Sequence, residues 1–332
     1  MTQEDIIIKK CFTCIFDMEM PFVNLTEQVL GDGDEKQQYM IQLILKHLNH
    51  TSLNRSRMDE NSALMQILPE GEEQLEAFAN GIADEIHTLM QEKSTDIPMG
   101  GGVFLWAFCE DRDYICFFKL NYQNKFVDSI DANGKEKWVL NTKIIPSTTQ
   151  KITELFFIDL SDKTVQISNV KHYVENEKSN YLSELILQLS IEKSEEEVVK
   201  TYQDAMIDTI QECYEEKAPE KIMEYKQAVA QSITEKGELD IVEIQKEVFE
   251  DNEQAKTVYK EKLEEKTVPI KSMEVSKKME KKLLKKQRIV TQSGIEVLVP
   301  IDYLKDPSIF EYKQNEDGTI SILIKDGIKK LV

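Results

Sequence analysis

The chain is poor in the residues and patterns that mark several large classes of protein. Its 332 residues include only 12 glycines, 8 prolines and 5 cysteines, which argues against collagenous, low-complexity and disulfide-scaffold proteins. Apolar runs such as Gly102–Cys109 fall far short of the roughly 20 residues that span a bilayer. Residues 1–5 show no cationic start before an apolar run, so no secretory signal is expected. These absences predict a soluble, intracellular protein of a reducing compartment, without membrane contact.

Acidic residues dominate the chain, but their excess is uneven. Asp and Glu number 61 against 41 Lys and Arg, a net charge of −20, and such a field repels nucleic acid and acidic membranes at long range. Residues 269–332 contain 13 basic and 9 acidic side chains, a net charge of +4, so residues 1–268 carry −24. Opposite charge within one chain indicates a surface for nucleic acid or for a partner.

Residues 1–188 mix helical and strand patterns. Apolar residues recur three and four positions apart in 34–50 and 72–93, as on one buried face of a helix. Runs rich in aromatic and β-branched residues predict strands over 6–16, 103–109, 114–122, 137–145, 154–159 and 164–167. Asn133-Gly134 is a strong hairpin turn signal. The predicted fold class is α+β, an N-terminal domain of helices and antiparallel sheet.

The strand signals stop after this domain, and residues 189–268 are predicted to form an acidic helical module. Ser194 and Glu197 form a capping box that opens its first helix. Pro219 suits a first helical turn, and Gly237 suits a helix end. Residues 192–266 contain 22 acidic and 11 basic side chains, so this module is strongly acidic.

The third predicted part, residues 269–332, combines a basic helix with two β-hairpins. The helix is expected over 272–287, and the hairpins over 288–299 and 309–325. The second hairpin turns at Asp317-Gly318, and three isoleucines at 320, 322 and 324 alternate as one face of a sheet does.

No pattern of catalytic or metal-binding residues is complete. Cys11 and Cys14 lie three apart on a predicted strand, so their sulfurs point to opposite faces, and burial is expected rather than zinc binding. His47 and His50 lie three apart on a helix, but His47 falls on the apolar stripe, as a core histidine does. Gly100–Gly102 follows a helix and precedes a strand, the reverse of a phosphate-binding loop, and is expected to stop the helix and to form a flexible entry to a sheet. The sequence predicts no catalytic residue, no metal site and no cofactor.

The helix predicted over 272–287 has one apolar side and one cationic side. Val275, Met279 and Leu283 share the apolar side. The other side carries two lines of lysines four residues apart, Lys277, Lys281 and Lys285 beside Lys278, Lys282 and Lys286, with Arg288 following. Six ammonium groups arranged in this way can follow a phosphate backbone. The alternative, of nearly equal weight, is a solvated face that neutralises the acidic helices before it.

Several loose motifs occur together over most of the chain. They are residues 6–17 and 20–23 at the start, 71–73, Phe78 and 101–104 in the centre, Ile158-Asp159-Leu160 and Tyr181-Leu182 at the end of the first domain, and 309–312 with 319–322 near the end. In this order they resemble the bacterial nucleoid-associated protein family of the NdpA type, in particular its Gram-positive members. The resemblance implies a cytoplasmic, nucleoid-associated protein without known enzymatic activity. Many members turn basic after the Tyr-Leu pair, whereas Ser183–Gln188 contains no lysine or arginine, so the cluster at 277–288 remains the DNA-binding candidate.

Two functions follow as hypotheses. The first is weak, sequence-independent binding of duplex DNA through the lysines of the basic helix and Arg288. The second is an acidic adaptor that does not bind DNA itself but docks on a DNA-handling protein through residues 1–188 and the acidic helical module. The sequence leaves a homodimer open in either case.

Overall fold

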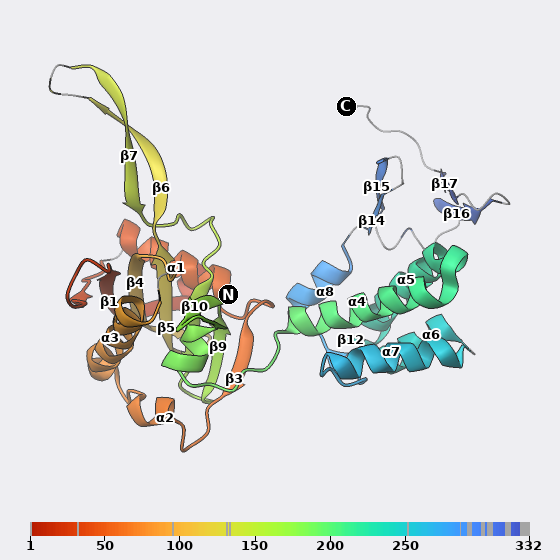
Figure 1. Cartoon of the computed structure of the whole chain (residues 1–332), viewed down its shortest axis with the longest axis horizontal. Helices are drawn as coiled ribbons and strands as arrows, with labels where there is room; N and C mark the ends of the chain where they lie inside the picture. The colour runs from red at the N-terminus through yellow and green to blue at the C-terminus, as the bar shows by residue number, and fades with distance from the viewer. Residues whose placement is uncertain are drawn as a thin grey trace. The chain divides into compact units, whose positions relative to one another are not determined.

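The structure, a computed structural model, confirms the α+β fold class and divides into two compact units, residues 1–194 (unit 1) and 195–332 (unit 2) (Figure 1). The residues described are 2–325 apart from 32, 95, 131, 133, 251, 286, 291–293, 300–302, 304–307 and 316–319. Only the backbone is described at 216, 287–290, 312–314 and 320.

Unit 1 is built on a seven-stranded antiparallel sheet in the order β2-β1-β4-β5-β8-β9-β3. Its strands are β1 (Ile6–Phe16), β2 (Thr26–Glu27), β3 (Asn54–Arg57), β4 (Gly100–Cys109), β5 (Arg112–Asn121), β8 (Glu154–Asp159) and β9 (Thr164–Ser168). The strands expected over 6–16, 103–109, 114–122, 154–159 and 164–167 are confirmed. The β4–β5 hairpin turns at Glu110 and Asp111, whose φ angles are +51° and +60°.

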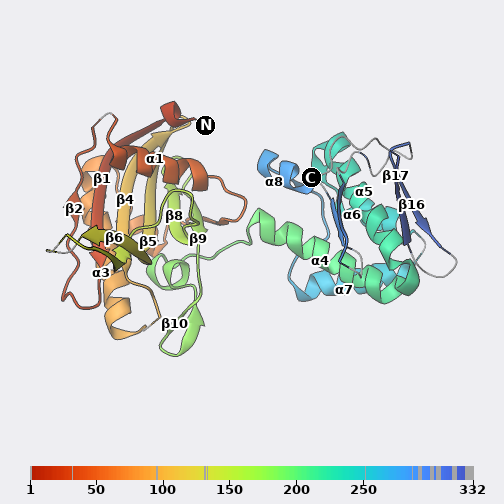
Figure 2. The same cartoon turned by 90° about the horizontal axis from the view of Figure 1, so that it is seen from above.

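Helices cover both faces of this sheet (Figure 2). α1 (Glu35–His47) packs on one face through Met40, Leu43 and Ile44. α3 (Leu75–Glu92), which continues the 3-10 turn η2 (Glu72–Gln74), packs on the other. The smaller elements of unit 1 are η1 (Gln3–Asp5), α2 (Ala63–Ile67), the hairpin β10 (His172–Val174) and β11 (Glu177–Ser179), and the π-helix η3 (Leu182–Ile186).

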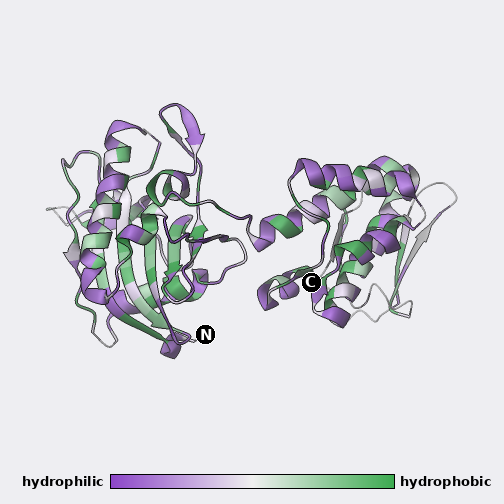
Figure 3. Ribbon diagram, turned by 90° about the horizontal axis from the view of Figure 1, so that it is seen from below, coloured by the Kyte–Doolittle hydropathy of each residue, from purple (hydrophilic) through white to green (hydrophobic). Residues whose placement is uncertain are grey.

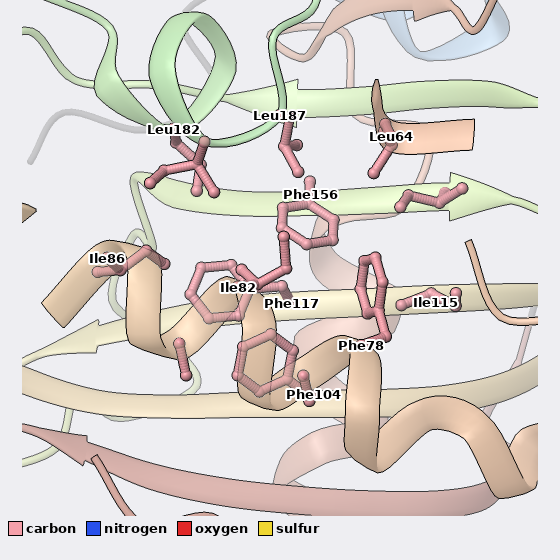
Figure 4. Packing of buried hydrophobic residues seen from close by; sticks show 14 of the residues in the cluster. Leu64, Phe78, Ile82, Ile86, Phe104, Ile115, Phe117, Phe156, Leu182 and Leu187 are labelled. Carbon is pink, nitrogen blue, oxygen red and sulfur yellow. The ribbon is translucent and has the colours of Figure 1, made fainter. Parts of the chain in front are cut away.

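Aromatic side chains from neighbouring strands form the centre of the core beneath α3 (Figure 4). Phe104, Phe117 and Phe156 lie side by side, with successive ring centroids 4.7 and 5.2 Å apart. The next residues along β5 and β8, Phe118 and Phe157, contact each other on the opposite face at 5.5 Å. Because both faces are buried, these strands are nearly continuous apolar runs, visible in green in Figure 3.

The glycine triplet is the entry to a sheet, as expected, but it does not stop the preceding helix. α3 ends at Glu92, and Gly100–Gly102 are the first residues of β4. A Cβ atom on Gly102 would lie 2.6 Å from Cys14 Sγ and 2.7 Å from Phe16 Cε2. Real side chains do not approach so closely, so glycine at this position lets β4 lie against the side chains of β1.

Between β5 and β8 the chain leaves the sheet as a two-stranded ribbon, β6 (Gln123–Ile130) and β7 (Glu136–Ile144), which projects from unit 1 (Figure 1). β7 and the turn were expected from the sequence, whereas β6 was not. Gly134 in the turn has a φ of +78°, which glycine adopts readily, and Asn133 lies outside the described residues.

Unit 2 begins with the helices expected from its capping residues. They are α4 (Glu195–Tyr214), η4 (Glu215–Lys217), α5 (Ala218–Lys236), α6 (Ile241–Phe249) and α7 (Glu253–Glu265). Pro219 stands in the first turn of α5, and Gly237, with a φ of +70°, ends it. The side chains of Asp240 and Asn252 accept hydrogen bonds from Glu243 N and Ala255 N, each at 3.0 Å, and so cap α6 and α7.

The rest of unit 2 packs partly on these helices. β12 (Glu238–Leu239) pairs with β13 (Met273–Glu274), α8 (Lys277–Leu283) follows, and two hairpins are formed by β14 (Gln287–Val290) with β15 (Glu296–Val299) and by β16 (Phe310–Gln314) with β17 (Ile320–Ile324). Both hairpins are confirmed, and the expected turn residues Ser293 and Asp317-Gly318 lie outside the described residues. Val268 and Met279 belong to the same core as the helices. The division into parts at 188/189 and 268/269 stays a prediction.

We predict that limited proteolysis of the native chain cuts first between residues 188 and 194, with a second region at 266–271. The segment before α4 exposes Gln188, Ser190 and Lys193, and proteases attack exposed connections more readily than packed elements. Trypsin at Lys193 should release fragments that mass spectrometry identifies as 1–193 and 194–332. Preferential cutting within β4 or β5 would contradict the division.

Candidate nucleic-acid interface

The basic helix is shorter than its sequence pattern predicts. The expected helix over 272–287 is reduced to α8, Lys277–Leu283, because Met273 and Glu274 pair with β12 and Gln287 opens β14. Ser276 sets the start of the helix, since its Oγ accepts a hydrogen bond from Met279 N at 3.2 Å. Within the shorter helix the apolar residue Met279 is buried and the lysines are exposed, as the sequence pattern predicts.

The apolar side of α8 packs on the helical core of unit 2. Met279 is 1% exposed and lies in the same cluster as Tyr202, Ile233 and Tyr259. Val275, Leu283 and other partly buried apolar side chains pack against that cluster. Burial of Met279 fixes the rotation of α8, so the residues on the opposite side face solvent.

The predicted lysines are placed as follows. Lys277, Lys278, Lys281 and Lys282 are exposed on α8, and exposed Lys285 lies one residue beyond its C-cap, Leu284. Lys286 lies outside the described residues, and of Arg288 only the backbone in β14 is described. Lys277 and Lys281 are one helical turn apart, about 6 Å along the axis. The structure therefore brings together the four lysines of α8 and Lys285.

Carboxylates at the start of α4 lie beside α8. Glu195 accepts hydrogen bonds from the backbone N and the Oγ of Ser276, at 2.6 and 2.7 Å. Lys282 Nζ lies 2.5 Å from Glu196, in a pair that is largely exposed, and such pairs contribute about 0–1 kcal/mol. Lys277, Lys281 and Lys285 form no ion pair within the part of the chain that the structure describes.

A second group of cations lies on unit 1. A depression of about 600 Å³ is lined by Arg55, Arg57 and Arg112, three of the four arginines in the chain. The same lining includes the carboxylates of Glu110, Asp159, Asp162 and Glu192. Arg112 is bound to Asp159 at 2.8 Å and to Asp162 at 3.0 Å. With more carboxylates than guanidiniums, this depression does not favour phosphate.

A buried polar cluster in unit 1 was not anticipated from the sequence. Lys119 on β5 lies opposite Glu154 on β8, with Nζ and Oε2 3.8 Å apart and both side chains almost completely buried. Tyr181 donates a hydrogen bond to Glu154 at 2.6 Å, and Asn121 donates another at 2.5 Å. His172 Nε2 lies 3.4 Å from the same carboxylate. Only the strand register places these residues together, so no sequence spacing could reveal them.

Burial and the neighbouring groups shift the pKa values of Glu154 and Lys119. Burial on its own raises the pKa of a carboxyl, but contact with His172 and the charge of Lys119 lower the pKa of Glu154 from 4.5 to about 2. Burial lowers the pKa of Lys119, and Glu154 opposes this shift. The charged atoms are shielded from solvent, so the cluster offers no open reaction site.

The cysteines and histidines considered as ligands are mostly core residues. Cys11 and Cys14 lie in the cores on opposite faces of the sheet, as expected, and burial raises the pKa of each thiol to about 12. Burial lowers the pKa of His47 to about 4. Cys213, in an apolar run of the sequence that also predicts burial, is only partly buried. Among the described residues no three His, Cys, Asp or Glu side chains are grouped to hold a metal ion.

Fold and surface together define an α+β protein whose most distinctive surface feature is a lysine-bearing helix. Residues 12–331 match the model of the family described as nucleoid-associated protein YejK. The match covers almost the whole chain, and the chain belongs to this family. Membership associates the protein with the nucleoid in the cytoplasm, and the family description names no enzymatic activity. No curated protein matches the sequence. No helix among the described residues is long and apolar enough to cross a membrane.

Replacing Glu154 by Gln should destabilise unit 1 by roughly 3–5 kcal/mol, because it leaves Lys119 buried without its counter-charge. Urea unfolding at neutral pH measures this change. The pKa of Glu154 is lower in the folded chain, so its contribution is complete above pH 4.5 and is lost as the pH falls towards 2. The stability difference between wild type and E154Q should therefore shrink over that window, and a pH-independent difference would contradict the assignment.

Proposed function

We propose that the protein binds duplex DNA weakly and without sequence preference through the lysines of α8 and Lys285, together with Lys286 and Arg288. Nonspecific DNA binding requires cations that reach phosphates and needs no pocket or base-reading groups. α8 supplies such cations on a helix whose opposite side is held by the core. Membership of a nucleoid-associated family supports this reading.

The observation that carries the proposal is the line begun by Lys277 and Lys281, one turn apart on α8, and followed by Lys285 just beyond its C-cap. All three side chains are exposed, and none forms an ion pair within the described residues. The alternative use of the lysines, neutralising the acidic helices, accounts for Lys282 through its contact with Glu196. It does not account for this line, which leaves three ammonium groups available to phosphate.

Replacing Lys277, Lys281 and Lys285 by Gln should weaken DNA binding at least tenfold at low salt and flatten its salt dependence. The log–log slope is about −0.9 per neutralised phosphate, so wild type should approach about −5 if six lysines engage, and the variant should lose about 2.7. Fluorescence anisotropy with a labelled duplex over a salt series measures both quantities. The melting temperature should change little, since exposed charges contribute little to stability.

A matched control removes the same charge elsewhere in unit 2. Lys217, Lys246 and Lys260 are exposed and lie on η4, α6 and α7. Their replacement by Gln alters the net charge equally, so it tests whether the overall field or the α8 surface governs binding. Equal losses of affinity in the two variants, or an unchanged slope in the α8 variant, would reject the site.

The adaptor hypothesis has its own supporting observation. A depression of about 880 Å³ on unit 1, between α3 and the β10–β11 hairpin, has Leu89, Val174 and Ile186 among its lining residues. Five carboxylates share the lining, those of Asp84, Glu85, Glu175, Glu177 and Glu184, against the two lysines Lys93 and Lys178. Such a surface suits a cationic protein segment. Salt-tolerant binding to a DNA-handling protein, without retention on DNA, would favour this function over the first.

A further inference from the structure

The β6–β7 ribbon exposes several large apolar side chains. Cross-strand partners share a face of an antiparallel pair, and alternate residues change face. The pairs Phe126 with Leu140, Asp128 with Trp138 and Ile130 with Glu136 therefore lie on one face. Phe126, Ile130, Trp138 and Leu140 are 66%, 70%, 77% and 47% exposed. These four side chains are called the apolar face of the ribbon below.

The opposite face of the ribbon is different in character. Lys125, Val127, Ser129, Lys137 and Val139 lie on it by the same pairing rule. Its apolar residues are two valines, and its charges are two lysines, whereas the apolar face carries the carboxylates of Asp128 and Glu136. The two faces of the ribbon therefore differ in composition, and the large side chains of the apolar face remain exposed.

The base of the ribbon is anchored to unit 1. Lys143 Nζ lies 2.7 Å from Asp17 Oδ2, and Tyr122 N donates a hydrogen bond to Met99 O at 3.0 Å. Gln150 adds a hydrogen bond from its amide to Gln123 Oε1 at 2.7 Å. These contacts lie at the end of the ribbon next to the sheet. They leave the apolar face, which lies farther along the two strands, open to a partner.

We infer that a second copy of the chain covers the apolar face, so that two ribbons pack against each other in a homodimer. The four side chains expose about 500 Å² per copy, near the upper end of the roughly 300–600 Å² of the largest patch on a typical monomer. Two copies together bury about 1,000 Å², close to the smallest area of a specific interface. An interface of this size lies at the low end of specific interfaces, where weak and transient association is found.

The ribbon as a whole carries less net charge than most of the chain. The chain carries a net charge of −20, which opposes self-association over most of its surface. Residues 123–144 contain four lysines and three carboxylates, so the ribbon is close to neutral. Asp128 and Glu136 lie on the apolar face itself, so their like charges oppose close contact of two copies locally, and added salt should weaken that repulsion. The inference does not depend on DNA binding and is tested without DNA.

Sedimentation velocity of the full chain over about 1–200 µM should show a monomer–dimer equilibrium. Replacing Phe126 and Trp138 by Ser should raise the dissociation constant at least 100-fold. Replacing Val127 and Val139 by Ser alters the opposite face of the same strands, so this matched control should change it less than fivefold. A wild type that stays monomeric throughout, or equal effects of the two double variants, would overturn the inference.

The substitutions could alter the structure of the ribbon as well as the dimer. Fluorescence quenching of the wild-type chain avoids this problem. The chain has two tryptophans, of which Trp106 is 4% exposed and Trp138 is 77% exposed. At low concentration acrylamide should quench the Trp138 part of the fluorescence. At high concentration dimerisation should protect it and shift the emission to shorter wavelength. Unchanged quenching over the whole concentration range would exclude burial of Trp138 between two copies.

Discussion

Burial of both faces of the unit 1 sheet is the constraint on which the rest of that unit depends. With α1 on one face and α3 on the other, every side chain of the central strands must be apolar or must find a partner inside. Lys119 and Glu154 meet this requirement because the β5–β8 register sets them directly opposite each other. Tyr181 donates a hydrogen bond to the same carboxylate, so a residue near the end of the unit satisfies the buried acceptor.

Local patterns were sufficient to predict most of the elements. Strand β1, helix α1 and the capped helices of unit 2 follow from periodicity and from capping residues such as Asp240. β6 escaped prediction because it begins with Gln123, Asn124 and Lys125, and its residues gain order from pairing with β7 rather than from burial. The role of Gly102 escaped for a similar reason, since Cys14 and Phe16 approach it only in the folded sheet.

In the candidate site, too, local sequence predicts some features, whereas others depend on residues far away in the chain. The four-residue spacing of lysines around Met279 predicts which side of α8 faces solvent, and the structure agrees. The length of the helix depends on distant partners, because Met273 pairs with Leu239 in β13–β12 and Ser276 binds Glu195. A prediction from local sequence uses only helix propensity and periodicity. It therefore made the helix too long at both ends.

The two proposed surfaces reinforce each other physically although they lie in different units. A short row of lysines on a chain of net charge −20 can hold DNA only weakly, because the surrounding field opposes approach. A dimer formed through the ribbons carries two such rows on one particle. Once the first row is bound, the second binds from an effective concentration that reaches the millimolar range for short connections, if the geometry allows both to engage. Dimerisation would then convert weak phosphate contacts into stable or bridging association with DNA, without any new contact to the bases.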